Sequence, residues 1–317
     1  MERYDENELR YIQNVGHFDE SASVFLARQL THVRAQVLRV KKAPLNAFTL
    51  FPVQTDIPEG AETAIQRTYD SVGIAEIISN YADDLPRVDL VAKEDSVKVM
   101  NLGDAYGWNE KEIKNAQFAQ VNLTADKALA ARRAMDVKIN KIAFRGDAKH
   151  KIVGFLDNAN ISSYALPTDG TGSSTRFSDK TEDQVIRDVN NIIRAVPLQT
   201  HEVEQINTLA FAPTVYAYLA TTRLSNTETT LLSFLQKVHP EVTRWMSVGE
   251  LEGAGTAGKN MIIGGNFTPE YIKLEIPQRF QQLPVERRNL EYIVNCVASI
   301  VGVTVTMPLA FVKVEGA

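Results

Sequence analysis

The segment Gly253–Lys259 is the place in the chain where glycine spacing points to phosphate chemistry. It contains the pattern G-x-G-x-x-G, and a lysine follows directly. Such a loop cradles phosphates when it lies between a strand and a helix N-terminus, whose backbone N–H groups point at the anion. Here Asn260 stands where a magnesium-binding Ser or Thr belongs, and residues 261–265 have the character of strand and turn. We expect a flexible loop, and keep a nucleotide-binding enzyme that uses Gly253–Lys259 as an alternative.

The other residues that commonly carry out chemistry form no recognisable constellation. No serine lies in G-x-S-x-G, and Cys296, the only cysteine, lies in an apolar run as a small hydrophobe would. A single cysteine excludes disulfide frameworks and structural zinc fingers. The histidines are scattered and match no metal-binding spacing: His17, His32, His150, His201 and His239. We therefore predict no catalytic, cofactor-binding or metal-binding residues, no cofactor and no enzymatic activity.

The composition is that of an ordinary globular chain with an acidic balance. Of the 317 residues 44% are apolar, and the formal charge is −5. Proteins that bind nucleic acid specifically are usually basic, so the acidic balance disfavours that class. It does not disfavour a structural protein that only faces nucleic acid. The acidic N-terminus lacks the apolar segment of a secretory signal. Residues 292–312 are mostly apolar, but polar interruptions and alternation over 301–307 predict buried strands and no membrane partner.

The elements that would position a site are arranged around one long helix-forming run. Residues 109–145 contain neither glycine nor proline, are rich in alanine and end at Gly146. Asn109 and Glu112 have the spacing of a capping pair, and Gly146 has the position of a C′ glycine. A continuous helix would be about 55 Å long at about 1.5 Å per residue, although a second segment could begin at Thr124. A single chain cannot easily cover such a rod, so we expect its neighbours to do so.

The residues before this run predict three different structures. Residues 24–42 place apolar residues at helical spacing among basic ones, which predicts an amphipathic helix docked on its own domain or on a neighbouring subunit. Residues 47–57 predict a strand. Residues 58–96 are charged and poor in core residues, with strand-like pieces at 63–72 and 87–91. Because an isolated hairpin is marginal in water, this region is either disordered or laid on another surface.

The residues after the run mix helices and strands without regular alternation, which predicts the α+β class. The expected elements are a Gly/Ser/Thr-rich loop at 168–180, helices at 181–196 with Thr181 as N-cap, 213–220 opened by Pro213 and 228–238, and strands at 208–211, 261–263, 271–276 and near 310–314.

Several sets of segments, taken in order, match one known family. They are Tyr69–Glu76 with Pro86–Asp89, Val97–Trp108, Arg145–Asp147 with Gly154–Asn158, Leu209–Tyr216, and Lys273–Arg279 with Glu291–Val294. Each segment is weak alone, but the ordered set spans nearly the whole chain. It resembles the major capsid proteins of tailed bacteriophages, whose fold, sometimes called the Johnson fold, is shared by encapsulins.

The resemblance implies a division of the chain into parts. The implied parts are an N-terminal arm at 1–46, an extended loop at 57–96, a peripheral domain at 47–56, 97–180 and 293–317 with a spine helix at 109–145, and an axial domain at 181–292.

The resemblance also implies a function and a set of partners. The chain is expected to be a major capsid protein that self-assembles as hexamers and pentamers into the icosahedral head shell around a tailed phage's double-stranded DNA. The implied location is the virion, after assembly in the host bacterial cytoplasm. Implied partners are other copies of the chain, a scaffolding protein, the portal, decoration proteins and packaged DNA held by non-specific contacts. The alternative within the same fold is an encapsulin-type nanocompartment shell protein.

Two features of relatives are not carried over from the resemblance. Some relatives have a large cleaved N-terminal scaffold, whereas only about 46 residues precede the first expected strand here, so we expect any scaffold to be a separate protein. Some relatives form a covalent cross-link between a loop lysine and an asparagine. Lys93 lies in the extended loop, but no partner is identified and we do not predict the bond.

Overall fold

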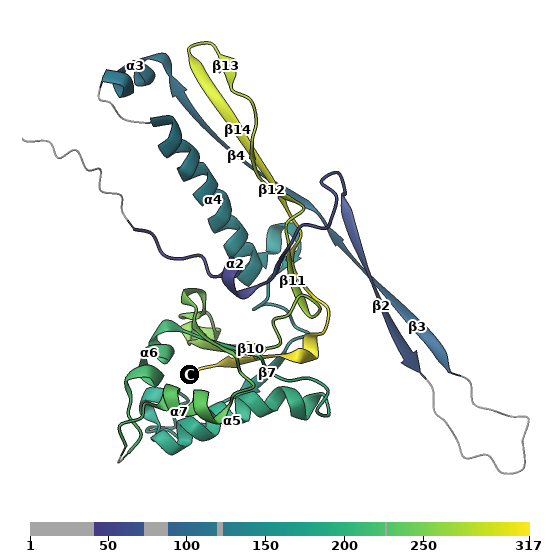
Figure 1. The fold of residues 1–317 in the computed structure, drawn as a ribbon, viewed down its shortest axis with the longest axis vertical. Helices are drawn as coiled ribbons and strands as arrows, with labels where there is room; N and C mark the ends of the chain where they lie inside the picture. The colour runs from purple at the N-terminus through teal and green to yellow at the C-terminus, as the bar shows by residue number, and fades with distance from the viewer. Residues whose placement is uncertain (1–40, 73–87, 119–122, 226) are drawn as a thin grey trace, which may run out of the picture. The chain divides into compact units, whose positions relative to one another are not determined.

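The computed structural model describes residues 41–72, 88–118, 123–225 and 227–317 (Figure 1). Residues 44–317 form one compact unit. Its helices, in chain order, are α2 (Ala47–Leu50), α3 (Glu110–Phe118), α4 (Leu123–Arg145), η1 (Ala148–His150), η2 (Phe177–Asp179), α5 (Glu182–Gln199), α6 (Pro213–Thr221), α7 (Leu231–Val238), η3 (Gly249–Leu251), η4 (Thr256–Gly258) and η5 (Pro308–Ala310).

The strands outnumber the helices in the described part of the chain and are mostly short. They are β1 (Val53–Gln54), β2 (Thr63–Val72), β3 (Asp89–Lys98), β4 (Met100–Asn109), β5 (Gly146–Asp147), β6 (Ile152–Val153), β7 (Ser162–Ala165), β8 (Thr208–Phe211), β9 (Arg244–Ser247), β10 (Met261–Gly265), β11 (Ile272–Glu275), β12 (Gln278–Gln282), β13 (Glu286–Arg288), β14 (Glu291–Ile300), β15 (Gly302–Val305) and β16 (Phe311–Glu315). The mixed order confirms the α+β class.

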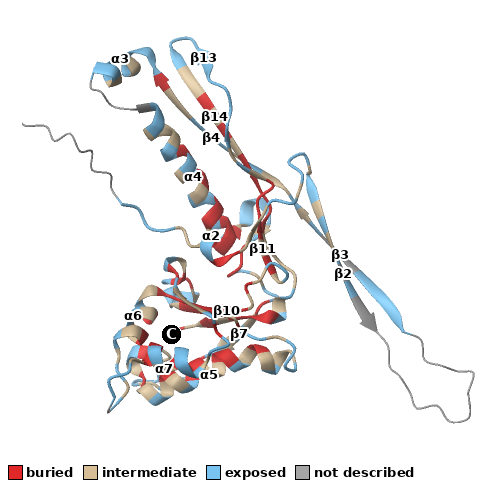
Figure 2. Ribbon diagram, in the orientation of Figure 1, coloured by how far each residue is buried: buried red, intermediate tan, exposed pale blue. Residues whose placement is uncertain are grey.

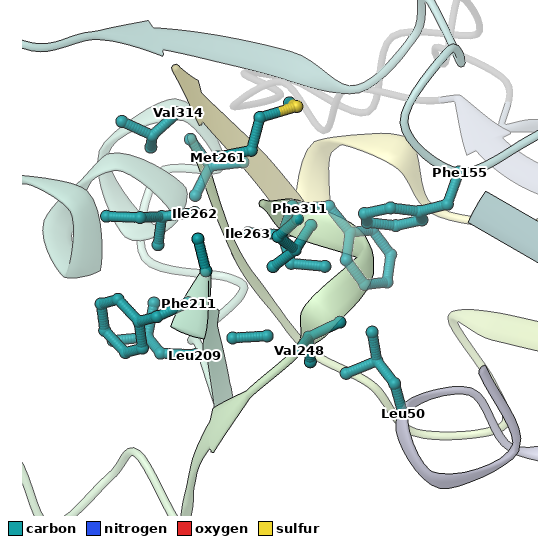
Figure 3. Close-up of a cluster of buried hydrophobic side chains, with 14 of the residues drawn as sticks. Leu50, Phe155, Leu209, Phe211, Val248, Met261, Ile262, Ile263, Phe311 and Val314 are labelled. Atoms are coloured by element: carbon teal, nitrogen blue, oxygen red, sulfur yellow. The ribbon is translucent and has the colours of Figure 1, made fainter. Parts of the chain in front are cut away.

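A five-stranded sheet lies at the centre of the larger core. Its strand order is β7-β16-β10-β8-β9, with parallel pairs at both ends and antiparallel pairs in the middle. All residues of β8 and β10 are buried, as expected for central strands covered on both faces. Figure 3 shows their side chains gathered with those of β16 in one apolar cluster.

Four phenylalanine rings extend this core beyond the sheet. Phe155 lies edge-on to Phe311 of β16, with ring centroids 5.6 Å apart, and Phe267 lies 5.2 Å from the same ring. Phe51 packs on both Phe155 and Phe267. Tilted and edge-to-face contacts of this kind add to the free energy of burying the rings.

A second sheet carries the long helix. β14 pairs with β12, β13 and β4, and its register with β4 runs without a break from Glu291↔Asn109 to Ile300↔Met100. α4 packs on this sheet through Ala131 and Met135, which join Trp108 of β4 and Cys296 of β14 in a smaller buried cluster. Figure 2 shows the buried stripe along α4, which widens toward its C-terminal end.

Several elements agree with the sequence. β8 spans the expected residues 208–211, and β10, β11 and β16 lie within two residues of the expected strands. α5 begins after Thr181, whose side chain forms a capping box with Gln184. Its apolar residues at helical spacing are buried: Val185, Val189, Ile192, Ile193 and Val196. Pro213 opens α6, as a first-turn proline should. β14 and β15 occupy most of 292–312, and no helix of the described residues is long and apolar enough to cross a membrane.

The strand expected at 47–57 is wrong over most of its length. Ala47–Leu50 is one turn of helix, and only Val53–Gln54 is a strand. Ala47, Leu50 and Phe51 are all buried, so the apolar residues follow helical rather than alternating spacing. The backbone N–H of Ala47 donates to Asn140 Oδ1 of α4 at 2.9 Å, which fixes the turn against the long helix.

The described residues of the run at 109–145 comprise the helices α3 and α4. α4 begins one residue before Thr124, the expected start of a second segment, and residues 119–122 lie outside the described residues. The capping pair is present, because Asn109 Oδ1 accepts from the Glu112 N–H at 2.7 Å. α3 has no fully buried residue and contacts the sheet mainly through the partly buried Ile113, so α4 is the helix that is anchored in the core.

One further expectation is changed, one sheet joins strands from both expected domains, and one expectation lies outside the described residues. The helix expected at 228–238 begins at Leu231, because Thr230 Oγ1 accepts from the Ser233 N–H and caps it. β7 and β16, expected in the peripheral domain, lie in the same sheet as β8, β9 and β10, expected in the axial domain. The amphipathic helix expected at 24–42 lies outside the described residues, except for 41–42, which are not helical.

We predict that Ala131→Pro prevents folding. Ala131 is buried in the middle of α4, and proline there removes a helix hydrogen bond and clashes with the preceding turn, at a cost of about 3 kcal/mol or more. Ala131→Gly, which keeps the hydrogen bond, should cost about 1 kcal/mol through propensity and leave a folded subunit. Soluble yield and circular dichroism would measure both, and a folded Ala131→Pro variant would contradict the prediction.

Candidate assembly surfaces

The β2–β3 hairpin has two unlike faces. Ten residue pairs join the strands, from Thr63↔Lys98 to Val72↔Asp89. Because side chains alternate along a strand, residues directly opposite each other share a face. One face, which we call the apolar face, carries Ile65, Tyr69 and Leu90, whose exposed fractions are 60%, 65% and 68%. The hairpin thus leaves the apolar surface of three large side chains exposed to water.

The apolar face also contains an ion pair that orders the hairpin without covering it. Arg67 Nε donates to Glu94 Oε1 at 2.7 Å, and the two residues are directly opposite in the register. Both side chains are more than half exposed, so this pair contributes at most about 1 kcal/mol. This ion pair therefore adds little to the stability of the hairpin and leaves the apolar side chains exposed.

The opposite face of the hairpin is joined to its own chain at the base. Gln66, which neighbours Ile65 and so points to the other side, donates from Nε2 to Thr306 Oγ1 at 2.9 Å. Val97, on the same side as Gln66, is half-buried, whereas Leu90 and Ile65 are not. The two faces thus differ in role as well as in composition.

The turn after α4 depends on two glycines in close contact. Gly146 has φ +68°, and a Cβ added to Gly154 would come 2.2 Å from the Gly146 nitrogen. The carbonyl oxygens of Ala143 and Phe144 accept from the N–H groups of Phe155 and Leu156, both at 2.9 Å. The expected C′ glycine is therefore confirmed, and the second glycine lets the returning chain satisfy the last carbonyls of the helix.

A lysine on α4 fixes the carboxylate that follows this turn. Lys138 Nζ donates to Asp147 Oδ2 at 2.7 Å, and His150 Nδ1 lies 3.4 Å from the other oxygen. These contacts, chiefly the hydrogen bond from Lys138, lower the pKa of Asp147 to about 2. Arg145 also pairs with Asp157 across the turn at 3.3 Å. The last turns of α4 are thus tied to the chain that leaves it.

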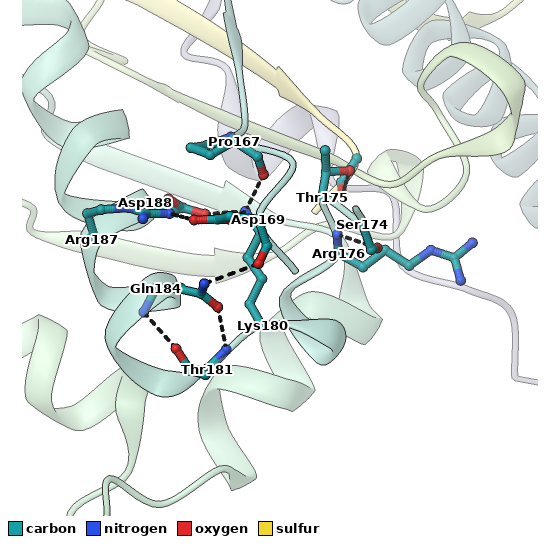
Figure 4. Close-up of polar contacts among 11 residues, drawn as sticks. Pro167, Asp169, Ser174, Thr175, Arg176, Lys180, Thr181, Gln184, Arg187 and Asp188 are labelled. Carbon is teal, nitrogen blue, oxygen red and sulfur yellow. Dashed lines mark hydrogen bonds and ion pairs between the residues drawn. The ribbon is translucent and has the colours of Figure 1, made fainter. Parts of the chain in front are cut away.

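A buried charge cluster holds the Gly/Ser/Thr-rich loop. Figure 4 shows Lys180 donating to Asp188 and to the Pro167 carbonyl, the latter at 2.8 Å, with Arg187 bridging Asp169 and Asp188 at 2.6 and 2.7 Å. The side chains of Lys180 and Asp188 are completely buried. Arg187, followed by Lys180, lowers the pKa of Asp169. Because an unpaired buried charge is very unfavourable, the loop is tied to α5 as long as this cluster is intact.

A buried glutamate lies near the chain segment that leads to the hairpin. Glu275 of β11 is 8% exposed and accepts from Thr304 Oγ1 at 3.0 Å. Burial raises the pKa of Glu275, and the charge of nearby Asp56 adds to the shift. The neighbouring residues 55–59 and 277–281 line an open cavity of about 590 Å³.

The Gly253–Lys259 loop does not have the geometry of a phosphate cradle. Most of its backbone N–H groups are already used: Gly255 and Gly258 donate within the loop, and Gly253 and Thr256 donate to Asn260 and Glu315. Strand β10 follows it instead of a helix, as expected. It forms one wall of a cavity of about 450 Å³, opposite the loop 173–178. Nothing in this geometry favours nucleotide binding.

The other residues singled out in the sequence lie apart from one another. Cys296 is buried in the smaller cluster, and burial raises the pKa of its thiol. His239 bridges Glu241 and Asn190, His150 contacts Asp147, and His17 and His32 lie outside the described residues. Among the described residues no group of three metal-ligating side chains occurs. The side chain of Lys93 is also outside the described part of the chain.

Comparison with known proteins decides the family. A family model described as major capsid protein matches residues 73–317, more than three quarters of the chain. The chain belongs to the major capsid protein family. As a major capsid protein, it forms the head shell of a phage, and the family match favours this reading over the encapsulin alternative. The family consists of structural shell proteins.

Solved structures show that this capsid protein has the fold of phage capsids. The capsid of Myoviridae phage XM1 superposes with a TM-score of 0.81 at 19% identity, over 93% of this chain and 99% of that one. The capsid of an empty GTA particle gives 0.67 at 9% identity, over 95% and 100%. Mycobacterium phage Ogopogo gives 0.60 at 15% identity, over 93% and 100%. No curated protein matches the sequence.

Sequence reasoning missed the buried cluster at Lys180 and Asp188. These residues are eight apart, and in the sequence each has the character of an ordinary charged residue near the start of a helix. One signal was present: Asp188 lies on the apolar face of α5 between Val185 and Val189, where a carboxylate needs a partner. The sequence could not identify that partner, because Lys180 precedes the helix.

We predict that Asp147→Asn destabilises the capsid protein in a pH-dependent way. The pKa of Asp147 is lowered from 3.8 to about 2, so its ionised form stabilises the fold fully above pH 4 and loses this contribution as the pH falls through about 2. The variant should melt below wild type at pH 7, and the difference should shrink toward pH 2. Asp157→Asn, which removes a longer and more exposed pair, should change the melting temperature less. A difference for Asp147→Asn that stays constant with pH would contradict this account.

Proposed function

We propose that this capsid protein assembles as hexamers and pentamers into an icosahedral head shell that encloses the double-stranded DNA of a tailed phage. The observation that carries the proposal is the apolar face of the β2–β3 hairpin, which has no cover among the described residues. A second copy of the chain supplies that cover. Each subunit then covers the next, and such head-to-tail contacts close into rings when the rotation is right.

The hairpin of one subunit lies across the spine helix of the next. The N-terminal half of α4 offers a suitable surface, because Leu129 is 53% exposed and the neighbouring Ala130 is small and exposed. Contact between these residues and the apolar face would remove large apolar side chains on both partners from water. Burying one leucine or isoleucine contributes about 1.5–3 kcal/mol, so two or three such side chains are sufficient for a specific contact.

The parts of the subunit follow the division implied by the family, with one change. The arm is 1–46, the extended loop 57–96 and the spine the helix within 109–145. The axial domain is 181–292 together with β7 and β16, because strands that share a sheet move as one body. The peripheral domain is the remainder of 47–56, 97–180 and 293–317.

The wider assembly has several partners. A separate scaffolding protein and the portal act during assembly in the host bacterial cytoplasm, decoration proteins add to the finished shell, and packaged DNA makes non-specific contacts with the wall. The protein acts as a wall and not as an enzyme. Shells observed by electron microscopy after expression of the full chain, with fivefold and sixfold rings, would support this function; a persistent monomer with or without scaffold would overturn it.

We predict that deleting residues 60–80 leaves a folded subunit that cannot build stable shells. The deletion removes β2 and the contact between subunits, whereas both sheets and α4 contain none of these residues. Circular dichroism should show a folded protein, and sedimentation and electron microscopy should show rings or monomers only. Normal particles from the deletion would remove the hairpin from its assigned role.

We predict that Leu90→Ser disrupts shells and Val91→Ser does not. The two residues are neighbours on β3 with exposed fractions of 68% and 55%, but only Leu90 lies on the apolar face. Loss of Leu90 should weaken each contact by about 1.5–3 kcal/mol, which lowers shell yield or dissociation temperature. Equal effects of the two substitutions would show that the faces are not distinguished.

A further inference from the structure

One folded segment of this acidic chain has a marked excess of positive charge. Residues 123–151, which comprise α4 and the turn after it, contain eight Lys and Arg and three Asp, a net charge of +5. The whole chain has a net charge of −5, so the remaining residues have a net charge of −10. An uneven distribution of this size creates a local potential that the total charge conceals.

The charges gather at the C-terminal end of α4. Positions 138, 141 and 145 are three and four residues apart, so they lie along one side of the helix. The contacts of Asp147 with Lys138 and His150 bring η1 to the same place, and with it Lys149 and Lys151. We call these five residues the basic surface: Lys138, Lys141, Arg145, Lys149 and Lys151.

Much of this charge is not neutralised. Asp147 pairs with Lys138, and Asp157 pairs with Arg145, while both basic side chains stay more than 40% exposed. Lys141, Lys149 and Lys151 are exposed and have no carboxylate partner among the residues that the structure describes. The basic surface and its two aspartates therefore have a net charge of +3.

The chemistry of the basic surface favours a phosphate backbone over another protein. Protein interfaces are depleted in lysine, and four of the five residues of the basic surface are lysines. Lysine and arginine are the usual partners of DNA phosphates, and duplex DNA offers about one charge per 1.7 Å of axis. Flexible lysines without fixed partners suit contacts that must tolerate any sequence.

We propose that the basic surface is where the shell wall contacts the backbone of packaged double-stranded DNA. This inference rests on the proposed function, because it requires α4 to face the enclosed genome. The residues outside 123–151 have a net charge of −10 and on balance repel DNA. A contact through this small surface positions DNA without holding it tightly.

The test compares two matched double variants of the full-length protein. Lys141→Gln with Lys149→Gln removes two charges from the basic surface; Lys111→Gln with Lys237→Gln removes two exposed charges elsewhere. Binding of a 40-base-pair DNA duplex is followed by fluorescence anisotropy over a range of salt concentrations. If both lysines contact phosphates, the slope of log K against log salt should fall by about 1.8 in the first variant, at about 0.9 per contact. The second variant should keep the wild-type slope.

Shell assembly without DNA separates this inference from the proposed function. Both variants should form empty shells as wild type does. Failure of wild type to form shells would overturn the proposed function. Normal shells together with equal salt slopes in all three proteins would overturn the DNA contact alone. Unchanged DNA binding with lost assembly in the Lys141→Gln, Lys149→Gln variant would show that the basic surface binds an acidic segment of another subunit instead.

Discussion

The subunit depends on the close contact between Gly146 and Gly154 at the end of the spine helix. No side chain fits between these two backbones, so the chain reverses directly after α4 and returns to the helix's last carbonyl groups. The reversal brings Phe155 into contact with Phe311 of the five-stranded sheet. Together with Ile142 and Phe144 of α4, which are buried in the larger core, this turn connects the helix with the five-stranded sheet.

The hairpin differs from this turn, because the described part of its own chain contacts only one of its two faces. Its register is complete and its base is tied to Thr306, but its apolar face has no cover among the described residues. In the assembly proposed above, a second subunit covers this face, so the contact that completes the hairpin of one subunit is also the contact that adds the next.

Local patterns predicted the local elements well. The capping box of α5, the proline that opens α6 and the glycine after α4 are each fixed by residues within a few positions, and each was found as expected. The wrong strand at 47–57 came from a long-range contact, because the turn at Ala47 depends on Asn140. The pairing of β16 with both β7 and β10 is also long-range and could not be predicted. The hairpin strands could be predicted, but which face is apolar required the register.

The position of β16 in the sheet also constrains when the fold can be completed. β16 lies between β7 and β10, so these two strands are joined only through residues 311–315. During synthesis, β7 and β10 leave the ribosome before β16. The strand edges that pair with β16 therefore stay unpaired until β16 is made, as happens whenever strands distant in sequence pair with each other. The sheet closes only when residue 315 has emerged. A chain that lacks residues 311–315 therefore cannot join β7 to β10 or complete this core.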